Sequence, residues 1–289
     1  MRIEDHKTIK LIQESGMLPA ISETFGVALN MLLVPVHYDM DSCIDELVKY
    51  PELEQMLLNS LNRGYGLRRT IQSVKEAVVY LGAKNARIII IAYITKLLLP
   101  NQGKTEIFDD IKYWNHCLAT SIASYLIAER TGLSEGDKLF TYGLVHDIGV
   151  TVLDICLPEL LSQIYSLQLK GSHQIVAEKL ILDGLTHAEI GMWFCKKLGL
   201  SKEVTEIVGY HHTPFIANNL SDEVKIMHMA DSISTNYYER LLGNDTTFLF
   251  SERIRLDLNI PIEFIHEISG KLPEEVEKVN QIINMNIFR

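Results

Sequence analysis

The chain has 289 residues, of which 47% are hydrophobic and 22% are charged. This balance is that of an ordinary globular protein, and it excludes a disordered chain. Acidic residues number 37 and basic residues 27, so the formal net charge is −10. Because no run of Lys and Arg offsets this charge, repulsion from phosphate backbones argues against nucleic acid as a direct partner.

The cysteines and the N-terminus predict the compartment. The cysteines lie far apart without a C-x-x-C pair, which is typical of reduced thiols in a cytoplasmic protein; they are Cys43, Cys117, Cys156 and Cys195. The N-terminal segment MRIEDHKTIK has no apolar run like that of a signal peptide. The apolar stretch Ile88–Thr95 is too short to span a bilayer. We therefore expect a cytoplasmic protein that does not enter a membrane.

Helical start and stop signals recur along the chain, whereas the alternation that marks strands is almost absent. Ser73–Glu76 has the S-x-x-E form of a capping box, and Gly82 ends the same segment. Thr186–Glu189 has a similar form, before a segment that Gly199 ends. We therefore predict an all-α protein.

Two breaks in composition divide the chain. Residues 101–105 (NQGKT) are the best linker candidate, and residues 243–245 (GND) mark a weaker break. We expect two packed helical lobes, an N-terminal helical bundle at residues 1–105 and a second helical core at residues 106–245. A short C-terminal helical tail would occupy residues 246–289.

The first candidate functional residues follow residues 139–145 (LFTYGLV). This segment is apolar almost all round and predicts a buried helix. His146 and Asp147 follow directly. A buried aspartate needs a partner or a metal ion, because an unpaired buried charge is very unfavourable. Taken alone, the pair could also be a satisfied core histidine beside an aspartate that caps a neighbouring group.

Other polar residues continue the apolar faces of predicted helices. His211 follows Ile207 and Val208 on one face and is followed by His212, and Pro214 ends the helix just beyond. In the same way, Asp231 shares a helix face with residues 224 and 227. His116 lies near the start of a helix whose small residues would let a neighbouring helix approach closely, and His187 lies in the first turn of its capped helix.

Imidazole and carboxylate together are the ligand types that bind Fe, Mn, Zn or Ni, and a shared carboxylate can bridge two ions. A metal would also solve the burial of both aspartates. We predict a site for one or two divalent transition-metal ions, with Asp147 as the bridging carboxylate. The predicted ligands are His116, His146, Asp147, His187, His211, His212 and Asp231.

This pattern resembles the HD superfamily of metal-dependent phosphohydrolases over residues 116–231. The segment THAEIG resembles the H-P-x-x-G stretch of the HD-GYP branch, and HMADSIS resembles its terminal Asp helix. Residues 106–245 would then be an HD-type core. The chain departs from HD-GYP enzymes, since Val150 replaces the Lys after H-D-x-G and TPFIANN replaces Gly-Tyr-Pro. Lys112 stands where a carboxylate would serve a third metal. These departures argue against a three-metal site and against cyclic-di-GMP hydrolysis.

The N-terminal lobe carries a second resemblance. Residues 51–91 (from YPELEQMLLNSLNRGYG to LGAKNARIIII) resemble the signature of HDOD domains, and the resemblance covers about residues 15–215. It implies an all-helical bacterial protein that is associated with signalling. Many HDOD domains have lost the HD metal ligands, whereas this sequence retains every position of the set.

Three functions follow from these features. The first is an HDOD regulatory protein with an unknown protein partner and a structural, sensory or vestigial metal site. The second is a metal-dependent phosphohydrolase, acting on a phosphodiester, a nucleotide or another phosphorylated small molecule, in which hydroxide attacks phosphorus. The third is a di-iron redox site, since His and carboxylate ligands also suit dioxygen chemistry. Because Val150 removes a cation that would steady the phosphate, the first function is favoured.

Overall fold

Helices make up the regular structure of the computed structural model, and no strand occurs among the described residues, which confirms the all-α prediction. The structure describes residues 3–18, 23–33, 39–51, 54–55, 58–59, 62, 70–83, 85–88, 90–91, 108–216, 221–241 and 251–283. The N-terminal elements are η1 (Ile3–Asp5), α1 (Lys7–Glu14), α2 (Glu23–Leu33), α3 (Met40–Leu47) and α5 (Val74–Leu81). The second lobe contains α7 (Asp110–Thr131), α8 (Gly136–Gly143), α9 (Ile148–Cys156), α10 (Pro158–Gln168), α11 (Gln174–Ile181), α12 (His187–Lys197), α13 (Lys202–Tyr210) and α14 (Ser221–Leu241). The C-terminal elements are α15 (Glu252–Asp257) and α16 (Ile262–Ile283).

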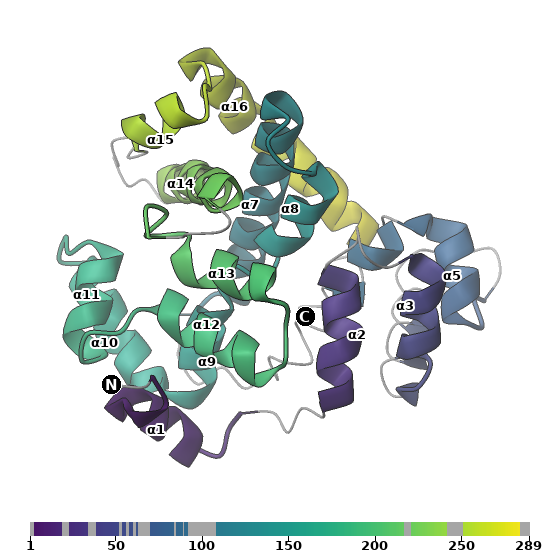
Figure 1. The fold of residues 1–289 in the computed structure, drawn as a ribbon, viewed down its shortest axis with the longest axis horizontal. Coiled ribbons are helices and arrows are strands. Elements are labelled where there is room, and N and C mark those ends of the chain that lie inside the picture. The colour runs from purple at the N-terminus through teal and green to yellow at the C-terminus, as the bar shows by residue number, and fades with distance from the viewer. Residues whose placement is uncertain are drawn as a thin grey trace.

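Helix α7 is central to the second lobe and packs against α8, α14 and α16 (Figure 1). Asp109 caps its N-terminus by accepting hydrogen bonds from two backbone N–H groups, and Gly132 ends it in the left-handed conformation. Ala119, Thr120 and Ala123 are fully buried, as expected for small residues where helices approach closely. The first turns of α7 are thereby held against α14, and this places His116 opposite Asp231.

A second layer is built from α9, α12 and α13, with α12 packed against both other helices. The contact between α9 and α12 depends on Gly149, because a Cβ atom at this position would lie 1.9 Å from the carbonyl oxygen of His187. The capping box predicted at α12 is present, since Thr186 and Glu189 cap each other's backbone N–H groups. Gly149 and this cap together fix the start of α12 beside the turn after α8.

Helices α1 and α2 of the N-terminal lobe both contact the second lobe. Helix α2 packs against α8, and Asn30 accepts a hydrogen bond of 2.8 Å from the backbone N–H of Ser201. Helix α1 instead packs against α9, and Thr8 donates a hydrogen bond of 2.8 Å to the carbonyl of Leu182. Figure 1 shows α1 beside α9 and α10, apart from α3 and α5. The two lobes are therefore packed together, as predicted.

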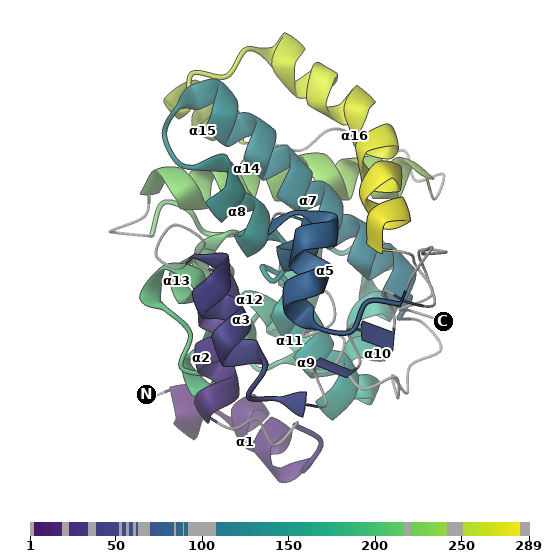
Figure 2. The same ribbon diagram turned by 90° about the vertical axis from the view of Figure 1, so that its right-hand side faces the viewer.

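The predicted C-terminal tail consists of α15 and α16, and α16 lies along α7 (Figure 2). Asn280 of α16 accepts a hydrogen bond of 3.2 Å from the indole of Trp114 and donates one of 2.9 Å to Asn115. This polar contact joins α16 to the turn of α7 that precedes His116. The boundaries predicted at residues 105 and 245 fall outside the described residues and stay predictions.

The apolar core passes close to the predicted ligands. The segment Gly136–Cys156, which comprises α8, a turn and α9, is long and apolar enough to cross a membrane, with a hydropathy of 1.4. Its most apolar part, an 18-residue window, is entirely buried inside the protein, so it is a core segment. All four cysteines are also buried and form no disulfide.

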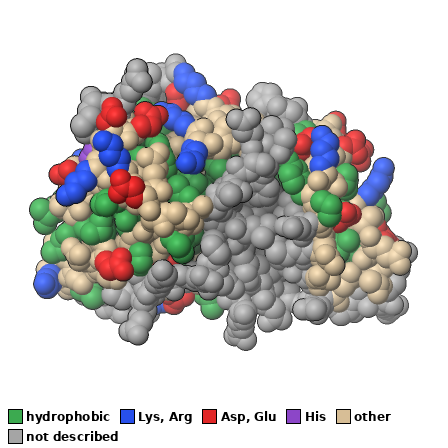
Figure 3. Space-filling model, turned by 90° about the horizontal axis from the view of Figure 1, so that it is seen from below, with side chains coloured by type: hydrophobic (Ala, Val, Ile, Leu, Met, Phe, Trp, Pro, Cys, Tyr) green, Lys and Arg blue, Asp and Glu red, His purple; other side chains and the backbone are tan. Residues whose placement is uncertain are grey.

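On the face seen in Figure 3, Lys and Arg side chains are interspersed with Asp and Glu, and the described part of this face has no broad basic area.

Candidate metal centre

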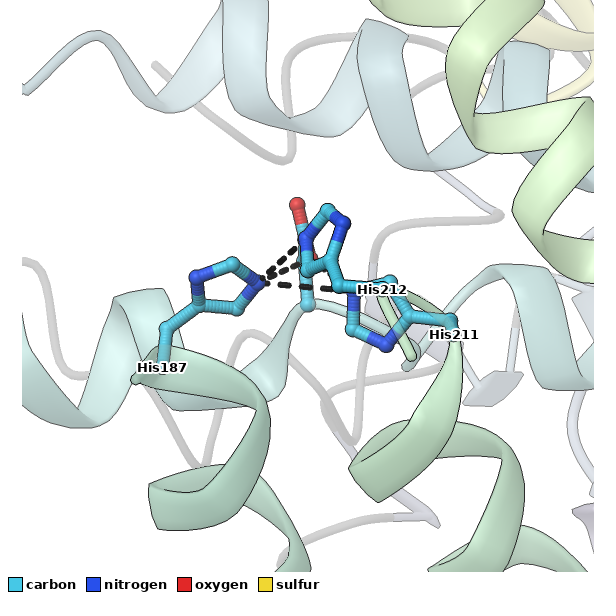
Figure 4. A group of neighbouring side chains, drawn as sticks. His187, His211 and His212 are labelled. Carbon is cyan, nitrogen blue, oxygen red and sulfur yellow. Dashed lines mark hydrogen bonds and ion pairs between the residues drawn. The ribbon is translucent and has the colours of Figure 1, made fainter. Parts of the chain in front are cut away.

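The structure brings all seven predicted ligands together. They form two adjoining groups, within each of which the candidate ligand atoms lie within 4.8 Å of one another. One group contains Asp147, His187, His211 and His212, and the other contains His116, His146 and Asp231. These residues come from α7, the turn between α8 and α9, the start of α12, the turn after α13, and α14. Figure 4 shows His187, His211 and His212 meeting from α12 and the end of α13.

Asp147 lies at the centre of this arrangement. Its Oδ1 atom is 3.2 Å from Nε2 of His187, 3.3 Å from Nε2 of His211 and 3.5 Å from Nε2 of His146. Its Oδ2 atom is 3.3 Å from Nε2 of His116. One carboxylate therefore faces imidazoles of both groups, which is the position that a bridging ligand needs.

Asp231 lies on the opposite side of the cluster from α9. Its Oδ1 atom is 3.3 Å from Nε2 of His116 and 3.7 Å from Nε2 of His146. Its Oδ2 atom is 3.6 Å from Nδ1 of His212, whose Nε2 is 3.0 Å from Nε2 of His187. Each aspartate thus contacts several imidazoles.

Hydrogen bonds at Nδ1 decide which ring nitrogen is available to a metal. Nδ1 of His146 lies 2.8 Å from the carbonyl of Gly143, and Nδ1 of His211 lies 2.8 Å from the carbonyl of Val208. Because a carbonyl only accepts, both rings donate through Nδ1 and keep Nε2 for the centre.

His116 has the same tautomer through a hydroxyl group. Ser234 donates its hydroxyl proton to the carbonyl of His116 at 2.9 Å, so its oxygen accepts from Nδ1 of the same ring at 3.0 Å. His187 completes the set, because its Nδ1 lies 2.7 Å from Oε1 of Glu178. Four imidazoles therefore direct Nε2 to one place.

The two aspartates and the surrounding imidazoles shift one another's pKa values. Although burial alone would lower it, Asp147 and Asp231 raise the pKa of His116 to about 10. Burial also opposes the charge on His146, yet the same carboxylates raise its pKa to about 10. Burial would raise the pKa of both aspartates, but the imidazoles hold the pKa of each well below its usual range. The aspartates are therefore ionised at neutral pH.

The remaining imidazoles fall into two classes. Burial lowers the pKa of His211, and burial together with His211 lowers the pKa of His212 well below its usual value, so both imidazoles are neutral. Burial would also lower the pKa of His187, but Glu178 and Asp147 raise it well above the usual value. In the same way, burial would raise the pKa of Glu178, but His187 lowers it. Glu178 is thus both buried and ionised.

The residues fit a divalent cation. Nε2 of His146 and Oδ1 of Asp147 are buried, and neither has a hydrogen-bond partner among the described residues. Buried polar atoms without partners are costly, and a cation at the centre would satisfy both. His146, His187 and His211 are almost fully buried, whereas the side chains of His116 and His212 are 16% and 21% exposed. The cluster therefore reaches solvent on the side of His116 and His212.

Some neighbouring residues were missed or set aside from the sequence. Glu178 was missed because QIVAEKLI reads as an ordinary amphipathic helix, and Ser234 was missed because a serine carries no signal of its own. Cys117, next to His116 in the sequence, is fully buried and belongs to neither ligand group. His228 lies beyond the cluster, where Nδ1 donates to the carbonyl of His211 at 2.7 Å.

Two positions mark departures from HD-GYP enzymes. Val150 is 7% exposed and packs in the apolar core, so this position supplies no cation. The Lys112 side chain is 56% exposed, and its Nζ atom lies 3.8 Å from Asp109, so it faces solvent rather than serving as a metal ligand.

Comparison with known proteins connects this site to a family. A family model of the HDOD domain matches residues 18–214, close to the range in which the sequence resembles such domains. The match includes six of the seven cluster residues and ends before Asp231. No curated protein matches the chain in sequence.

Several solved structures share the fold. A presumed phosphohydrolase from Shewanella amazonensis superposes with a TM-score of 0.66 at 20% identity, covering 96% of this chain and 99% of its own. An HDOD domain protein of unknown function from Geobacter sulfurreducens gives 0.68 at 21% identity, covering 94% and 97%. A presumed signal transduction protein from Marinobacter aquaeolei gives 0.74 at 19% identity, covering 100% of this chain and 62% of its own. At these identities the likeness shows the fold alone.

Proposed function

The chain belongs to the HDOD domain family, and we propose that it is a signal-transduction protein whose helical core holds one or two divalent transition-metal ions. The presumed signal transduction protein from Marinobacter aquaeolei, which has the same fold, supports the first part of this proposal. The His/Asp cluster supports the second part. A protein partner would then receive the signal, inside the cytoplasm.

One observation carries the proposal of a metal site. Four imidazoles have Nδ1 on a hydrogen-bond acceptor and Nε2 directed to the centre, where two ionised carboxylates also meet. A histidine that serves only for packing needs no such arrangement, whereas a metal-binding histidine requires a fixed tautomer. The ligands would be the seven residues predicted from the sequence, and nitrogen with oxygen donors suits Mn, Fe, Ni or Zn.

A regulatory role is favoured over catalysis because of what surrounds the site. Val150 is apolar and buried where a lysine would assist phosphate chemistry, and Lys112 is largely exposed. In such a protein Asp147 and the imidazoles hold α7, α9, α12, α13 and α14 together. The state of the centre would then be read by a partner through the arrangement of these helices.

The alternative is a metal-dependent phosphohydrolase, and the partial exposure of His116 and His212 favours it, since a substrate could reach this side. When bound, divalent ions in such a site act as Lewis acids toward phosphoryl oxygens and make water a better nucleophile at neutral pH. In this chain Asp147 and Asp231 would hold the charge of the centre, and His116 and His212 would face the substrate.

The metal site is tested by elemental analysis of protein purified without a metal-binding tag. A His146→Ala/Asp147→Ala double variant removes the central ligands. His173→Gln is the matched control, since it removes an exposed imidazole at the N-cap of α11 that makes no capping hydrogen bond. We expect stoichiometric metal in the wild type and the control, and none in the double variant. A wild type that holds no metal and cannot be loaded with Mn²⁺ or Zn²⁺ would overturn the proposal.

Regulation and catalysis are separated by assaying the Mn²⁺-loaded protein. A regulatory protein should not hydrolyse bis(p-nitrophenyl) phosphate or nucleotides, and it should capture a partner that the metal-free double variant does not capture. Turnover that is lost in Asp147→Asn but kept in His173→Gln would instead establish the phosphohydrolase. A visible absorption band that changes on reduction would indicate a redox site.

A further inference from the structure

Glu178 is a buried acid that the predicted ligand set does not use. It lies on α11 and is 2% exposed, so its carboxylate is out of contact with solvent. A buried carboxylate is costly unless its oxygens are satisfied. Both of its oxygens are satisfied by a single residue, His187, with further support from Gln174.

The contact with His187 has two parts. Oε1 of Glu178 lies 2.7 Å from Nδ1 of the ring, and Oε2 accepts a hydrogen bond of 3.0 Å from the backbone N–H of His187. His187 is the first residue of α12, where backbone N–H groups have no partner within the helix. One carboxylate therefore fixes both the first turn of this helix and the rotation of the ring.

Gln174, one turn earlier on α11, holds the carboxylate in place. Its side-chain amide donates to Oε1 of Glu178 at 3.0 Å. The amide nitrogen also lies 3.4 Å from Nδ1 of His187, so the three side chains form a closed polar group. Glu178 is thereby confined to the geometry that serves His187.

His187 differs in this respect from the other imidazoles whose Nδ1 partners are described. His146 and His211 donate to backbone carbonyls, and His116 donates to a hydroxyl oxygen. Only His187 among these four faces a carboxylate. An anionic acceptor at Nδ1 increases the electron density at Nε2 and strengthens its bond to a metal ion more than a neutral acceptor does.

We propose that Glu178 is a positioning residue that holds His187 as an Nε2 metal ligand, so that the group containing Asp147, His187, His211 and His212 retains its ion more tightly than the group containing His116, His146 and Asp231. This inference rests on the proposed metal site and adds an order of affinity within it.

The test compares Glu178→Gln with Glu206→Gln. Glutamine at 178 keeps an oxygen for the backbone N–H of His187 but removes the negative charge from Nδ1. Glu206 is the matched control, because it is a carboxylate of 15% exposure on α13 that pairs with Lys202 at 3.4 Å. Zn²⁺ affinity is measured for each protein by competition with a chromophoric chelator.

We expect Glu178→Gln to weaken binding of the tighter ion by about 10–100-fold, the usual effect of removing a hydrogen-bond partner of a metal ligand. Glu206→Gln should bind as the wild type does. Equal affinity of the tighter ion in wild type and Glu178→Gln would overturn the inference and leave the metal site standing. A wild type that binds no Zn²⁺ would instead overturn the proposed metal site, and this inference with it.

A second measurement does not depend on the folding of any variant. Long-range ¹H–¹⁵N spectra of the Zn²⁺-loaded wild type report which nitrogen of His187 carries the proton. We expect a protonated Nδ1 and a metal-bound Nε2. A protonated Nε2 on His187 would overturn the role of Glu178.

Discussion

Replacing Gly149 with alanine should separate two helices that carry ligands. A Cβ atom at this position would lie 1.9 Å from the carbonyl oxygen of His187 and 2.8 Å from the backbone nitrogen of Gly191. Both are backbone atoms, so no side-chain rotation can relieve the overlap. Helix α9 must move away from α12 by about 1.5 Å to restore an ordinary van der Waals distance.

The energetic result combines a gain and a loss. Alanine is favoured over glycine inside a helix by about 0.5–1 kcal/mol. Overpacking of a core contact costs about 1–3 kcal/mol, and backbone overlap lies at the upper end of that range. We therefore expect Gly149→Ala to lower the free energy of unfolding by about 2–2.5 kcal/mol in urea denaturation.

The same substitution should also weaken metal binding. Metal–ligand distances tolerate deviations of only about 0.2 Å, so a shift of His187 relative to Asp147 removes one of the two from the coordination sphere. Zn²⁺ affinity should fall by about 10–100-fold.

The control is Gly270→Ala on α16, where an added Cβ atom meets nothing within 4 Å. Here the helical preference acts alone, so we expect stability to rise by about 0.5–1 kcal/mol with unchanged metal affinity. Wild-type stability together with wild-type metal affinity in Gly149→Ala would refute the argument from close approach.

Three further predictions follow from the contacts described above. The pKa values of His116 and His146 are about 10 without metal, so Mn²⁺ must displace protons from both imidazoles when it binds. Mn²⁺ affinity should therefore rise with pH up to about 10, and a potentiometric titration in which binding releases no protons would contradict this. The raised pKa values of the two histidines stabilise the metal-free fold fully below pH 6.5 and progressively less toward pH 10. The lowered pKa values of Asp147 and Asp231 stabilise it above pH 3.8. The thermal stability of the metal-free protein should therefore be greatest between pH 3.8 and pH 6.5, and a melting temperature that keeps rising toward pH 10 would disagree. Asn280→Ala removes the hydrogen bond that the buried indole N–H of Trp114 donates to Asn280 and should cost about 0.5–1.5 kcal/mol in urea denaturation. An unchanged free energy of unfolding would argue against this contact.

The cluster could be predicted from the sequence because its residues interrupt apolar patterns. Asp147 follows a segment that is buried throughout, and His211 continues an apolar helix face, so each needed a polar explanation. Pro214 predicted that this helix ends just beyond the histidine pair, and α13 ends slightly earlier, at Tyr210. Ligands of this kind are visible in a sequence because their neighbours are apolar.

The residues that hydrogen-bond to the histidines of the cluster could not be predicted in this way. Glu178 lies in a helix with an ordinary polar face, and its burial results from the packing of α11 close to the start of α12. The hydroxyl of Ser234 reaches His116 across the contact between α14 and α7. Such roles depend on the distance between helices, which local periodicity does not contain.

The fold shows the same division. The capping box of α12 and the end of α5 at Gly82 were predicted from local residues. The position of α1 was not, since it packs on α9 rather than beside α3 and α5, and its Thr8 donates a hydrogen bond to Leu182 at the end of α11, 174 positions away. Neither hydrophobic periodicity nor capping specifies which of several apolar surfaces a short helix will cover.

The proposed ligands come from five separate places along the chain, and this has a consequence for the fate of the protein in a cell. An unfolded chain scatters them, so an ion recognises only the assembled core. An ion present at one hundred times its dissociation constant would add about 2.7 kcal/mol to the stability of the folded state. Degradation acts on molecules that open, so the lifetime of this protein should lengthen when the metal is plentiful and shorten when it is scarce. The supply of an inorganic nutrient would in this way set how much of the protein persists.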